Sequence, residues 1–401
     1  MNFVFYNPSR IVGGAEHLFF RLYELYKQQG YNCKVVDYAD GAFSVLGVPP
    51  QDVIAISSIR EKFIATCDVF LLPPNMAYEA LRNVSMGEDS KVIFWSIHPY
   101  NCIPILPFAF YKKLEASSFL KKTIDLVLLG VQFKYARSLF KSASDKNALL
   151  FMDGENYSFG QKFIGGQVAK HFLPIPSPVI SDSKVKIDVQ RKSLNFFWVG
   201  RLVDFKIGAL NRVIQDLEAW SQQQGVDVVL HIVGSGDSED KMLTPEYCKI
   251  QKHGYVDNAT LHELLATTAD AVFSMGTSTL ESGAIGVPSF IVMPTYEAVG
   301  AERSYMPLSE TVNFDLGAFS ATQGVKNFEE LVVGGYLERI YGESCKSYVL
   351  QHHDLARVAE QLVVMAQSSN FRFKEISNSY RKFFMSRYIS VSYTHLTLPT
   401  S

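Results

Sequence analysis

The sequence lacks paired cysteines, long apolar runs and an excess of charge of either sign. Its five cysteines are scattered and never form a Cys-x-x-Cys pair, so neither a disulfide framework nor a zinc site is indicated. No apolar run approaches the roughly 18 residues of a spanning helix, and the N-terminus has no basic segment followed by a hydrophobic one. We therefore expect a cytoplasmic protein without a signal peptide or a transmembrane segment.

The charge balance and two missing motifs exclude further classes of protein. Lys and Arg number 38 against 40 Asp and Glu, so no overall field attracts nucleic acid. Neither a Gly-x-Gly-x-x-Gly segment nor a Gly-Lys dipeptide occurs anywhere in the chain. Because these loops hold nucleotide phosphates in dehydrogenases and in P-loop nucleotide hydrolases, we set both classes aside.

What the sequence does contain is an α/β pattern that runs twice through 401 residues, a length that suggests two domains. Strand-like runs alternate with helix-permissive stretches over residues 1–178, the last run being 172–175. A polar, charged linker follows at 179–194, and the pattern restarts over 195–370. We expect two Rossmann-like domains, each built on a parallel sheet.

The end of the chain has two further parts. An aromatic and basic helix over 371–390 could return to the first domain. Residues 391–401 resemble translated vector sequence, so they are left out of the fold.

The clearest candidate site is a compact βαβ unit, Asp270–Val292. The apolar residues 271–275 suit a buried strand, and Gly276 suits a turn. Ser278 and Glu281 stand at capping-box spacing, which predicts the start of a short helix. The helix N-terminus would lie at the carboxyl edge of a sheet, where α/β proteins bind phosphate. Its candidate phosphate-binding residues are Gly276, Thr277, Ser278 and Thr279.

A second candidate is the loop after the strand at 195–199, which projects two cations, Arg201 and Lys206. Fixed cations at a strand's carboxyl end stabilise a leaving group that gains negative charge in the transition state. The alternative is a solvated ion pair, such as Arg201 with Asp204.

Four segments, taken in their order and spacing, resemble nucleotide-sugar glycosyltransferases of the two-domain GT-B fold, especially family 4. They are VGGAEHLFF at 12–20, WVGRLVDFKIG at 198–208, LHIVGSGD followed by HGYVD at 230–257, and STLESGAIGVP at 278–288. The resemblance implies a cleft between the domains, a nucleotide-sugar donor, a saccharide or lipid-linked acceptor, and no cofactor. It also implies a role in bacterial surface polysaccharide or lipopolysaccharide synthesis.

The resemblance also implies roles for residues of the second half. Arg201 and Lys206 match residues that contact the donor diphosphate. Glu281 matches the residue that holds the ribose hydroxyls, although a capping box alone would also explain it. The backbone of Gly254, Tyr255 and Val256 is expected to bind the nucleotide base, and a plain strand end is the alternative. Gly234 is also expected to bind the donor.

In the first half, Gly13 and Gly14 lie between the first strand and helix, where small residues let backbone N–H groups approach phosphate or acceptor. A tight turn alone explains them almost equally well. His98 follows an apolar strand and resembles a cleft histidine of related enzymes, suited to acceptor deprotonation or binding. An ordinary loop histidine before Pro99 is the alternative.

The sequence departs from family 4 at one position. Members commonly carry a glutamate eight positions before the one matching Glu281, and this chain has Phe273 there. That glutamate faces the donor sugar in the family, so we assign no catalytic role to Phe273. Retention of the anomeric configuration, usual in the family, therefore stays open.

Several expectations complete the prediction. The chain has no Asp-x-Asp pair, the signature of metal-dependent GT-A enzymes, so no metal is expected. A basic excess in 111–146, with PFAFY just before it, could dock on anionic lipid, although a solvated face is the alternative. Two other functions share the fold. A nucleotide-sugar 2-epimerase is less favoured because the chain opens with NPSRIVGG and not a GTRPE-like segment, and the other is a non-catalytic nucleotide-sugar-binding protein.

Overall fold

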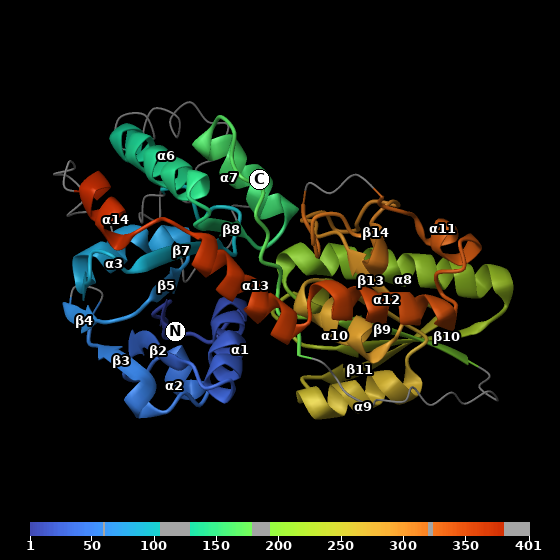
Figure 1. Ribbon diagram of the computed structural model, residues 1–401. Coiled ribbons are helices and arrows are strands. Elements are labelled where there is room, and N and C mark those ends of the chain that lie inside the picture. The colour runs from blue at the N-terminus through green and yellow to red at the C-terminus, as the bar shows by residue number, and fades with distance from the viewer. Residues whose placement is uncertain (59–60, 105–128, 179–192, 320–323, 381–401) are drawn as a thin grey trace. The chain divides into compact units, whose positions relative to one another are not determined.

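The computed structural model describes residues 1–58, 61–104, 129–178, 193–319 and 324–380 (Figure 1). It divides into two compact α/β units. The first comprises Met1–Pro176 and the chain from Leu355 onward, and the second comprises Ser177–Asp354. Each unit is built on a six-stranded sheet, so the expected fold class is confirmed.

The sheet of the first unit has the strand order β3-β2-β1-β5-β7-β8, with all neighbouring strands parallel. Its strands are β1 (Asn2–Tyr6), β2 (Asn32–Tyr38), β3 (Val53–Ile56), β5 (Val69–Leu72), β7 (Lys91–Ser96) and β8 (Leu149–Phe151). A separate pair joins β4 (Phe63–Ala65) to β6 (Val84–Met86). The helices are α1 (Gly14–Gln28), α2 (Ala42–Val45), α3 (Ala77–Asn83), α6 (Gly130–Asp145), α7 (Gly154–Ile164), α13 (Leu355–Ser368) and α14 (Phe373–Tyr380).

The first sheet is covered on both faces, which explains why its central strands are continuously apolar. All four residues of β5 are buried. Phe5 of β1 packs on Phe19 of α1 on one face, while its neighbour Tyr6 packs on Phe70 toward the other. Successive side chains of a strand point to opposite faces, so this alternation fixes which side α1 covers.

The helix α13 belongs to the first unit, although the sequence predicts a second domain that extends to residue 370. The Tyr26 hydroxyl of α1 donates to the Ala359 carbonyl at 2.7 Å. Lys91 of β7 donates to the last carbonyls of α13, those of Ala366 and Gln367, at 2.8 and 2.7 Å. The expected helix over 371–390 is described as α14, and residues 381–401 lie outside the described chain.

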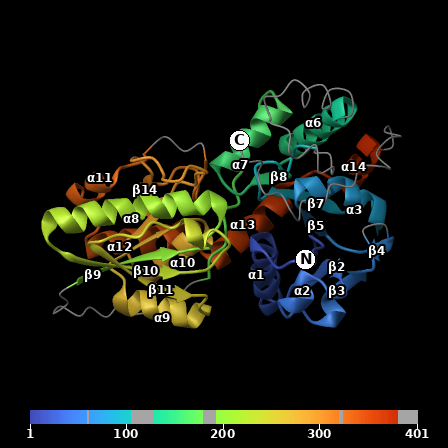
Figure 2. The same cartoon turned by 180° about the vertical axis from the view of Figure 1, so that it is seen from behind.

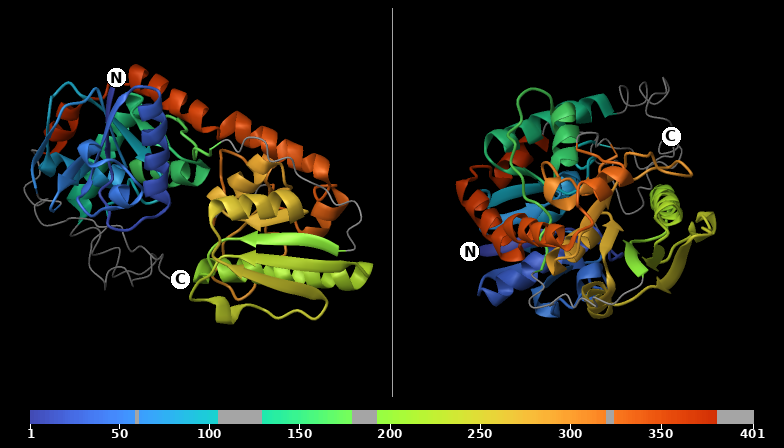
Figure 3. Two further views of the ribbon diagram at one scale, coloured as in Figure 1. Left: turned by 90° about the horizontal axis from the view of Figure 1, so that it is seen from below. Right: turned by 90° about the vertical axis from the view of Figure 1, so that its right-hand side faces the viewer.

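The second sheet has the strand order β11-β10-β9-β12-β13-β14, and its edge strand β14 is antiparallel to β13 while the other neighbours are parallel. Figure 3 shows β9, β10 and β11 as neighbouring arrows in green to yellow. Its strands are β9 (Ser193–Val199), β10 (Asp227–Val233), β11 (Cys248–Gly254), β12 (Ala271–Ser274), β13 (Ser289–Val292) and β14 (Tyr305–Pro307). The helices are α8 (Asp204–Gln224), α9 (Asn258–Thr268), α10 (Thr277–Ile285), α11 (Phe328–Val333) and α12 (Arg339–His352).

Helices α8 and α9 cover opposite faces of this sheet (Figures 1 and 2). Phe196 of β9 packs on Trp220 of α8. Its neighbour Phe197 belongs to the core that contains Leu261 and Leu265 of α9. The carboxyl ends of β9 to β13 all point to one edge because these strands are parallel.

Two local predictions are wrong. The expected strand at 172–175 forms only an isolated bridge between Phe172 and Phe151, because the neighbouring strand β8 ends at Phe151. The expected capping box at Ser278 is also absent. The N-cap of α10 is Gly276, which places Ser278 inside the first turn.

Candidate functional site

Three loops at the carboxyl ends of β9, β10 and β11 are joined by backbone hydrogen bonds. The Gly200 N–H donates to the Val233 carbonyl at 3.0 Å, and the Gly234 N–H donates to the Gly254 carbonyl at 2.7 Å. These bonds hold the loops in one fixed arrangement at the carboxyl edge, where open α/β sheets bind ligands.

The contact between these loops requires glycine at position 234. Its φ is +133°, and a Cβ there would lie 2.1 Å from the Gly200 carbonyl oxygen. Gly236 shows the same close approach, with a built Cβ 2.0 Å from the Leu202 oxygen. Gly234 therefore allows the loops to meet, and the structure gives this packing as the reason for the glycine.

Lys206 lies in the first turn of α8 beside the Gly200 turn. Its Nζ is 3.5 Å from the position that a Cβ on Gly200 would occupy. Burial, and then the nearby Arg201 charge, lower the pKa of Lys206 to about 8. Within the described ranges no carboxylate forms an ion pair with Lys206. A desolvated cation without a fixed counter-charge is suited to an anionic ligand.

Arg201 is exposed on the same loop. The alternative ion pair between Arg201 and Asp204 does not form in the part of the chain that the structure describes. The Asp204 carboxylate instead accepts the Phe205 N–H at 2.8 Å. Both loop cations are therefore available to a ligand.

The sequence prediction missed Trp198, the residue before the end of β9. Its side chain is fully buried, and its indole N–H has no hydrogen-bond partner in the described structure. The indole Nε1 lies 3.7 Å from the position that a Cβ on Gly200 would occupy, the same position that the Lys206 Nζ approaches. The unpaired buried indole N–H and the desolvated Lys206 ammonium therefore lie beside the same glycine turn. A tryptophan two residues before the Gly-Arg loop was the available signal.

The turn between β12 and α10 supplies a further set of donors. Gly276 has φ +66° and ψ −134°, a conformation that only glycine adopts readily. The next two N–H groups, those of Thr277 and Ser278, open α10 and have no protein partner in the described chain. The Thr279 side chain is not available to a ligand, because its buried hydroxyl bonds to Ser274 at 2.8 Å.

Glu281 and the segment after β11 flank these donors. Glu281 is half-buried in the second turn of α10, beyond the N-cap position. Tyr255 is 86% exposed and follows Gly254, whose φ is +65°. Val256 packs against the core beneath α9, so only its backbone can face a ligand.

Phe273 lies inside β12 and not in a loop. Its ring is fully buried and packs on Phe196, Phe290 and Tyr305. Only Met275 and Gly276 separate β12 from α10. The position eight residues before Glu281 therefore lies in the core. The turn between β12 and α10 is too short for that position to lie in the loop beside the site.

In the first unit, the start of α1 already holds a carboxylate. Glu16 accepts the Gly13 N–H at 3.0 Å and the Asn7 side-chain amide at 3.0 Å. These contacts form a capping box, in which the Glu16 carboxylate satisfies the N–H group of the N-cap residue Gly13. A Cβ on Gly14, by contrast, would meet nothing within 4 Å.

His98 follows β7 and is held by a polar turn. The Asn101 side-chain oxygen accepts the N–H groups of Ile97 and His98 at 2.9 and 2.8 Å. The His98 Nδ1 accepts the Tyr100 N–H at 3.3 Å, and burial lowers the pKa of the ring. A neutral ring with Nδ1 as acceptor carries its proton on Nε2. His98 is therefore a hydrogen-bond donor in this structure.

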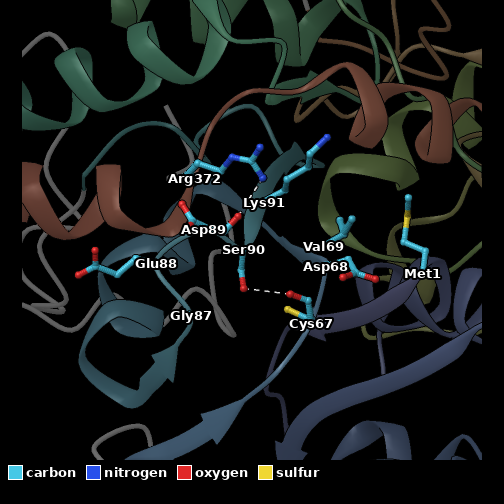
Figure 4. Close-up of a pocket in the computed structure, with 10 residues that line it drawn as sticks. All are labelled: Met1, Cys67, Asp68, Val69, Gly87, Glu88, Asp89, Ser90, Lys91 and Arg372. Atoms are coloured by element: carbon cyan, nitrogen blue, oxygen red, sulfur yellow. Dashed lines mark hydrogen bonds between the residues drawn. The ribbon is translucent and has the colours of Figure 1, made fainter.

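A cavity of about 440 Å³ lies at the opposite, amino-terminal edge of the first sheet (Figure 4). Three of its charged side chains are engaged with the protein: Lys91 contacts the end of α13, Asp68 accepts the Asn2 N–H, and Arg372 donates to the Asp89 carbonyl. Ser90 donates to the Cys67 carbonyl at 2.9 Å. None of the residues predicted for the site lines this cavity.

Comparison with solved structures shows the same two-unit architecture in known proteins. HepE of Anabaena, solved with UDP, superposes with a TM-score of 0.54 at 14% identity, over 92% of this chain and all of that chain. The chain has the GT-B fold. Other GT-B structures include a glycosyltransferase from Rickettsia africae, at TM-score 0.52 and 12% identity over 94% and 98% of the two chains.

A third GT-B structure is WaaG, a glycosyltransferase involved in lipopolysaccharide biosynthesis. It has a TM-score of 0.50 at 14% identity, and the match covers 91% of this chain and 99% of that one. No protein-family model matches the sequence, and no curated protein matches it.

The described residues contain no group of three or more His, Cys, Asp or Glu side chains that could hold a metal ion. Among the helices of the described ranges, none is both long and apolar enough to cross a membrane. Half of the basic segment 111–146 falls in residues 105–128, outside the described chain.

Proposed function

We propose that this protein is a glycosyltransferase that moves a sugar from a uridine diphosphate sugar to a saccharide or lipid-linked acceptor. The observation that carries the proposal is the desolvated Lys206 at the joined loops of the second unit, with which no carboxylate of the described residues forms an ion pair. UDP in the HepE structures, one of them also with glucose, supports a uridine nucleotide. The GT-B fold supports the reaction class but does not establish it.

In this proposal Lys206, Arg201 and the N–H groups that open α10 bind the donor diphosphate. Breaking the bond between sugar and diphosphate leaves negative charge on the phosphate oxygens. Cations and N–H donors that are already in place stabilise this charge without reorganisation. Their charge could replace that of a metal ion, in line with the missing Asp-x-Asp pair. In this scheme Glu281 holds the ribose, and Tyr255 with the Val256 backbone holds the base.

We assign His98 to substrate binding, the second of its two expected roles. Acceptor deprotonation needs a free imidazole lone pair, and the Tyr100 N–H occupies the lone pair of Nδ1. The Nε2–H can instead donate to a hydroxyl or a phosphate oxygen.

We further propose a role in bacterial surface polysaccharide or lipopolysaccharide synthesis, at the inner face of the plasma membrane. WaaG supports the pathway class. The basic segment 111–146 supports contact with anionic lipid. Pelleting with phosphatidylglycerol vesicles at low salt, and release at high salt, would support membrane contact. Absence of binding at low salt would remove it.

The deciding experiment is a thermal-shift screen with EDTA, using UDP, GDP, ADP and their sugar conjugates, followed by an assay for released UDP. A ligand at 100 times its Kd stabilises the folded state by about 2.7 kcal/mol. We expect UDP and UDP-sugars to raise the Tm, and UDP release to require an acceptor. Binding without release would indicate a binding protein, and interconversion of UDP-sugars an epimerase. No shift with any nucleotide would refute the proposal.

A further inference from the structure

Three aromatic side chains from three separate segments meet at the carboxyl edge of the second sheet. Phe205 begins α8, Tyr296 follows β13, and Phe319 follows β14. The ring centroids of Tyr296 and Phe319 are 5.5 Å apart with an angle of 11° between the planes. Phe205 lies 6.5 Å from Tyr296 and 6.3 Å from Phe319. We call these three residues the aromatic platform.

The platform is not part of the buried core. Phe319 is 44% exposed, and Phe205 and Tyr296 are half-buried. Phe273, in the same unit, is fully buried. Aromatic rings gain stability when they are removed from water, so a partly exposed group of three suggests a face kept open for a ligand.

The platform is continuous with the proposed diphosphate site. Phe205 is the neighbour of Lys206, whose Nζ lies 5.9 Å from the Phe205 ring centroid. The Thr295 N–H donates to the Phe205 carbonyl at 2.9 Å, which ties the Tyr296 segment to the start of α8.

The Phe319 segment is tied to the other side of the same site. The Gly276 N–H, in the turn before α10, donates to the Leu316 carbonyl at 2.9 Å. Gly317 packs on Met275, because a Cβ atom added to this glycine would lie 3.5 Å from the Met275 side chain. The platform therefore lies between the Lys206 loop and the segment that packs on the α10 turn.

The sheet order separates this platform from the proposed base site. Tyr255 follows β11, at one edge of the sheet, whereas Tyr296 follows β13, on the far side of β9. A nucleotide whose base lies near Tyr255 and whose diphosphate lies at Lys206 would direct its sugar toward the platform.

We propose that the aromatic platform binds the apolar face of the donor's hexopyranose ring. This inference rests on the proposed function and names its substrate class, a UDP-hexopyranose. One face of a pyranose presents C–H groups, which carry a small positive charge and match the negative face of an aromatic ring. Its hydroxyl groups remain at the rim and in water. Stacking on these rings would take the place of the glutamate contact to the donor sugar that family 4 members commonly have. The short turn at Gly276 carries no carboxylate side chain for that contact.

The test compares binding of UDP with binding of UDP-glucose, UDP-galactose and UDP-N-acetylglucosamine by isothermal titration calorimetry. Phe319→Ala removes the most exposed ring, and Phe319→Trp restores a stacking surface. Tyr247→Ala is the matched control, because Tyr247 is 53% exposed and precedes β11 at the opposite edge of the sheet.

We expect wild type to bind one UDP-hexopyranose more tightly than UDP. Phe319→Ala should lose about three- to tenfold in affinity for that UDP-sugar, with UDP affinity unchanged. Phe319→Trp should restore the preference, and Tyr247→Ala should keep it.

Three results would overturn the inference. Wild type with no preference for any UDP-sugar over UDP would show that the sugar makes no such contact. A Phe319→Ala variant that keeps the preference but binds acceptor more weakly would place the acceptor on the platform. Wild type that binds no UDP at all would reject both this inference and the proposed uridine donor.

Discussion

Lys206 is held at the carboxyl edge of the second sheet at a cost to stability. Its ammonium is desolvated beside Gly200 and Trp198, and Arg201 lies close enough to disfavour its charge further. In the unfolded chain the same lysine has an ordinary pKa of about 10.4. A group that destabilises the fold and yet occupies the carboxyl edge of the sheet is typical of a functional position.

Replacing Lys206 with methionine should therefore stabilise the protein while weakening UDP binding. Methionine has a similar length and needs no hydration, so the free energy of unfolding at pH 7 should rise by up to about 3 kcal/mol. Urea denaturation measures this change, and calorimetry measures UDP binding. Lower stability together with wild-type UDP affinity would assign the lysine a purely structural role.

The affinity for UDP should also fall as pH rises above about 8. The folded-state pKa of Lys206, about 8, is below its unfolded value, so the free protein loses this charge between pH 7 and 9. Bound diphosphate would raise the pKa, and the affinity should drop about tenfold over that range. Lys206→Met should show a flat profile over the same range. The stability of the free protein should run the other way, rising between about pH 8 and 10.4, where the unfolded chain binds more protons.

His98 gives a third test at the residue scale. If its Nε2–H donates to the substrate, His98→Gln should retain more activity than His98→Ala, because the glutamine amide also donates. Wild type and both variants should also show the same pH dependence of kcat/KM on the acid side. An acid limb present in wild type and lost in both variants would return His98 to the role of base.

At the scale of elements, the site depends on loops that approach one another too closely for side chains. Gly234 and Gly236 lie against the backbone of the Gly200–Leu202 loop. Gly208 of α8 lies against the Glu297 carbonyl, whose oxygen would be 2.0 Å from a Cβ atom added to this glycine. The loop that carries Tyr296 is therefore fixed on α8. Within the second unit the proposed ligand groups come from five different segments, and glycine contacts set the spacing of several of them.

Gly234→Ala should break this arrangement. The new Cβ would meet the Gly200 oxygen at 2.1 Å, in a backbone conformation that alanine rarely adopts, so we expect a loss of more than about 2 kcal/mol and of UDP binding. Gly130→Ala is the control, since a Cβ there meets nothing within 4 Å. Chemical denaturation of both variants checks the difference, and equal stabilities would contradict the proposed packing role.

At the scale of the whole molecule, the chain passes through both units and then returns. Helix α13 completes the first unit by covering α1 and β7, so this unit is built from two distant parts of the sequence. The core of this unit includes Leu362 and Ala366 of α13, which are both fully buried.

A matched pair of substitutions in α13 tests this dependence. Leu362 is fully buried and Val364 is 56% exposed on the same helix. Leu362→Asp should lower the free energy of unfolding by more than about 3 kcal/mol, since it buries an unpaired carboxylate. Val364→Asp should change it by about 0.5 kcal/mol or less. Similar effects in both variants would show that α13 does not complete this core.

The sequence by itself determined the α/β class, the repeated pattern, and which strands are buried, because these follow from the local periodicity of apolar residues. It also indicated the cation loop at Arg201 and Lys206 and the turn at Gly276, whose residue types carry their chemistry in any fold. It could not locate the N-cap of α10, since Gly276 and Ser278 are both acceptable there, whereas in the structure Gly276 takes a positive φ and its N–H donates to the Leu316 carbonyl. The tertiary structure alone decided that Phe273 is core, that the Trp198 N–H has no partner within the described chain, that Glu16 closes a capping box at the start of α1, and that Phe205, Tyr296 and Phe319 meet. Each of these depends on contacts between segments far apart in the chain, which no local pattern of residues encodes.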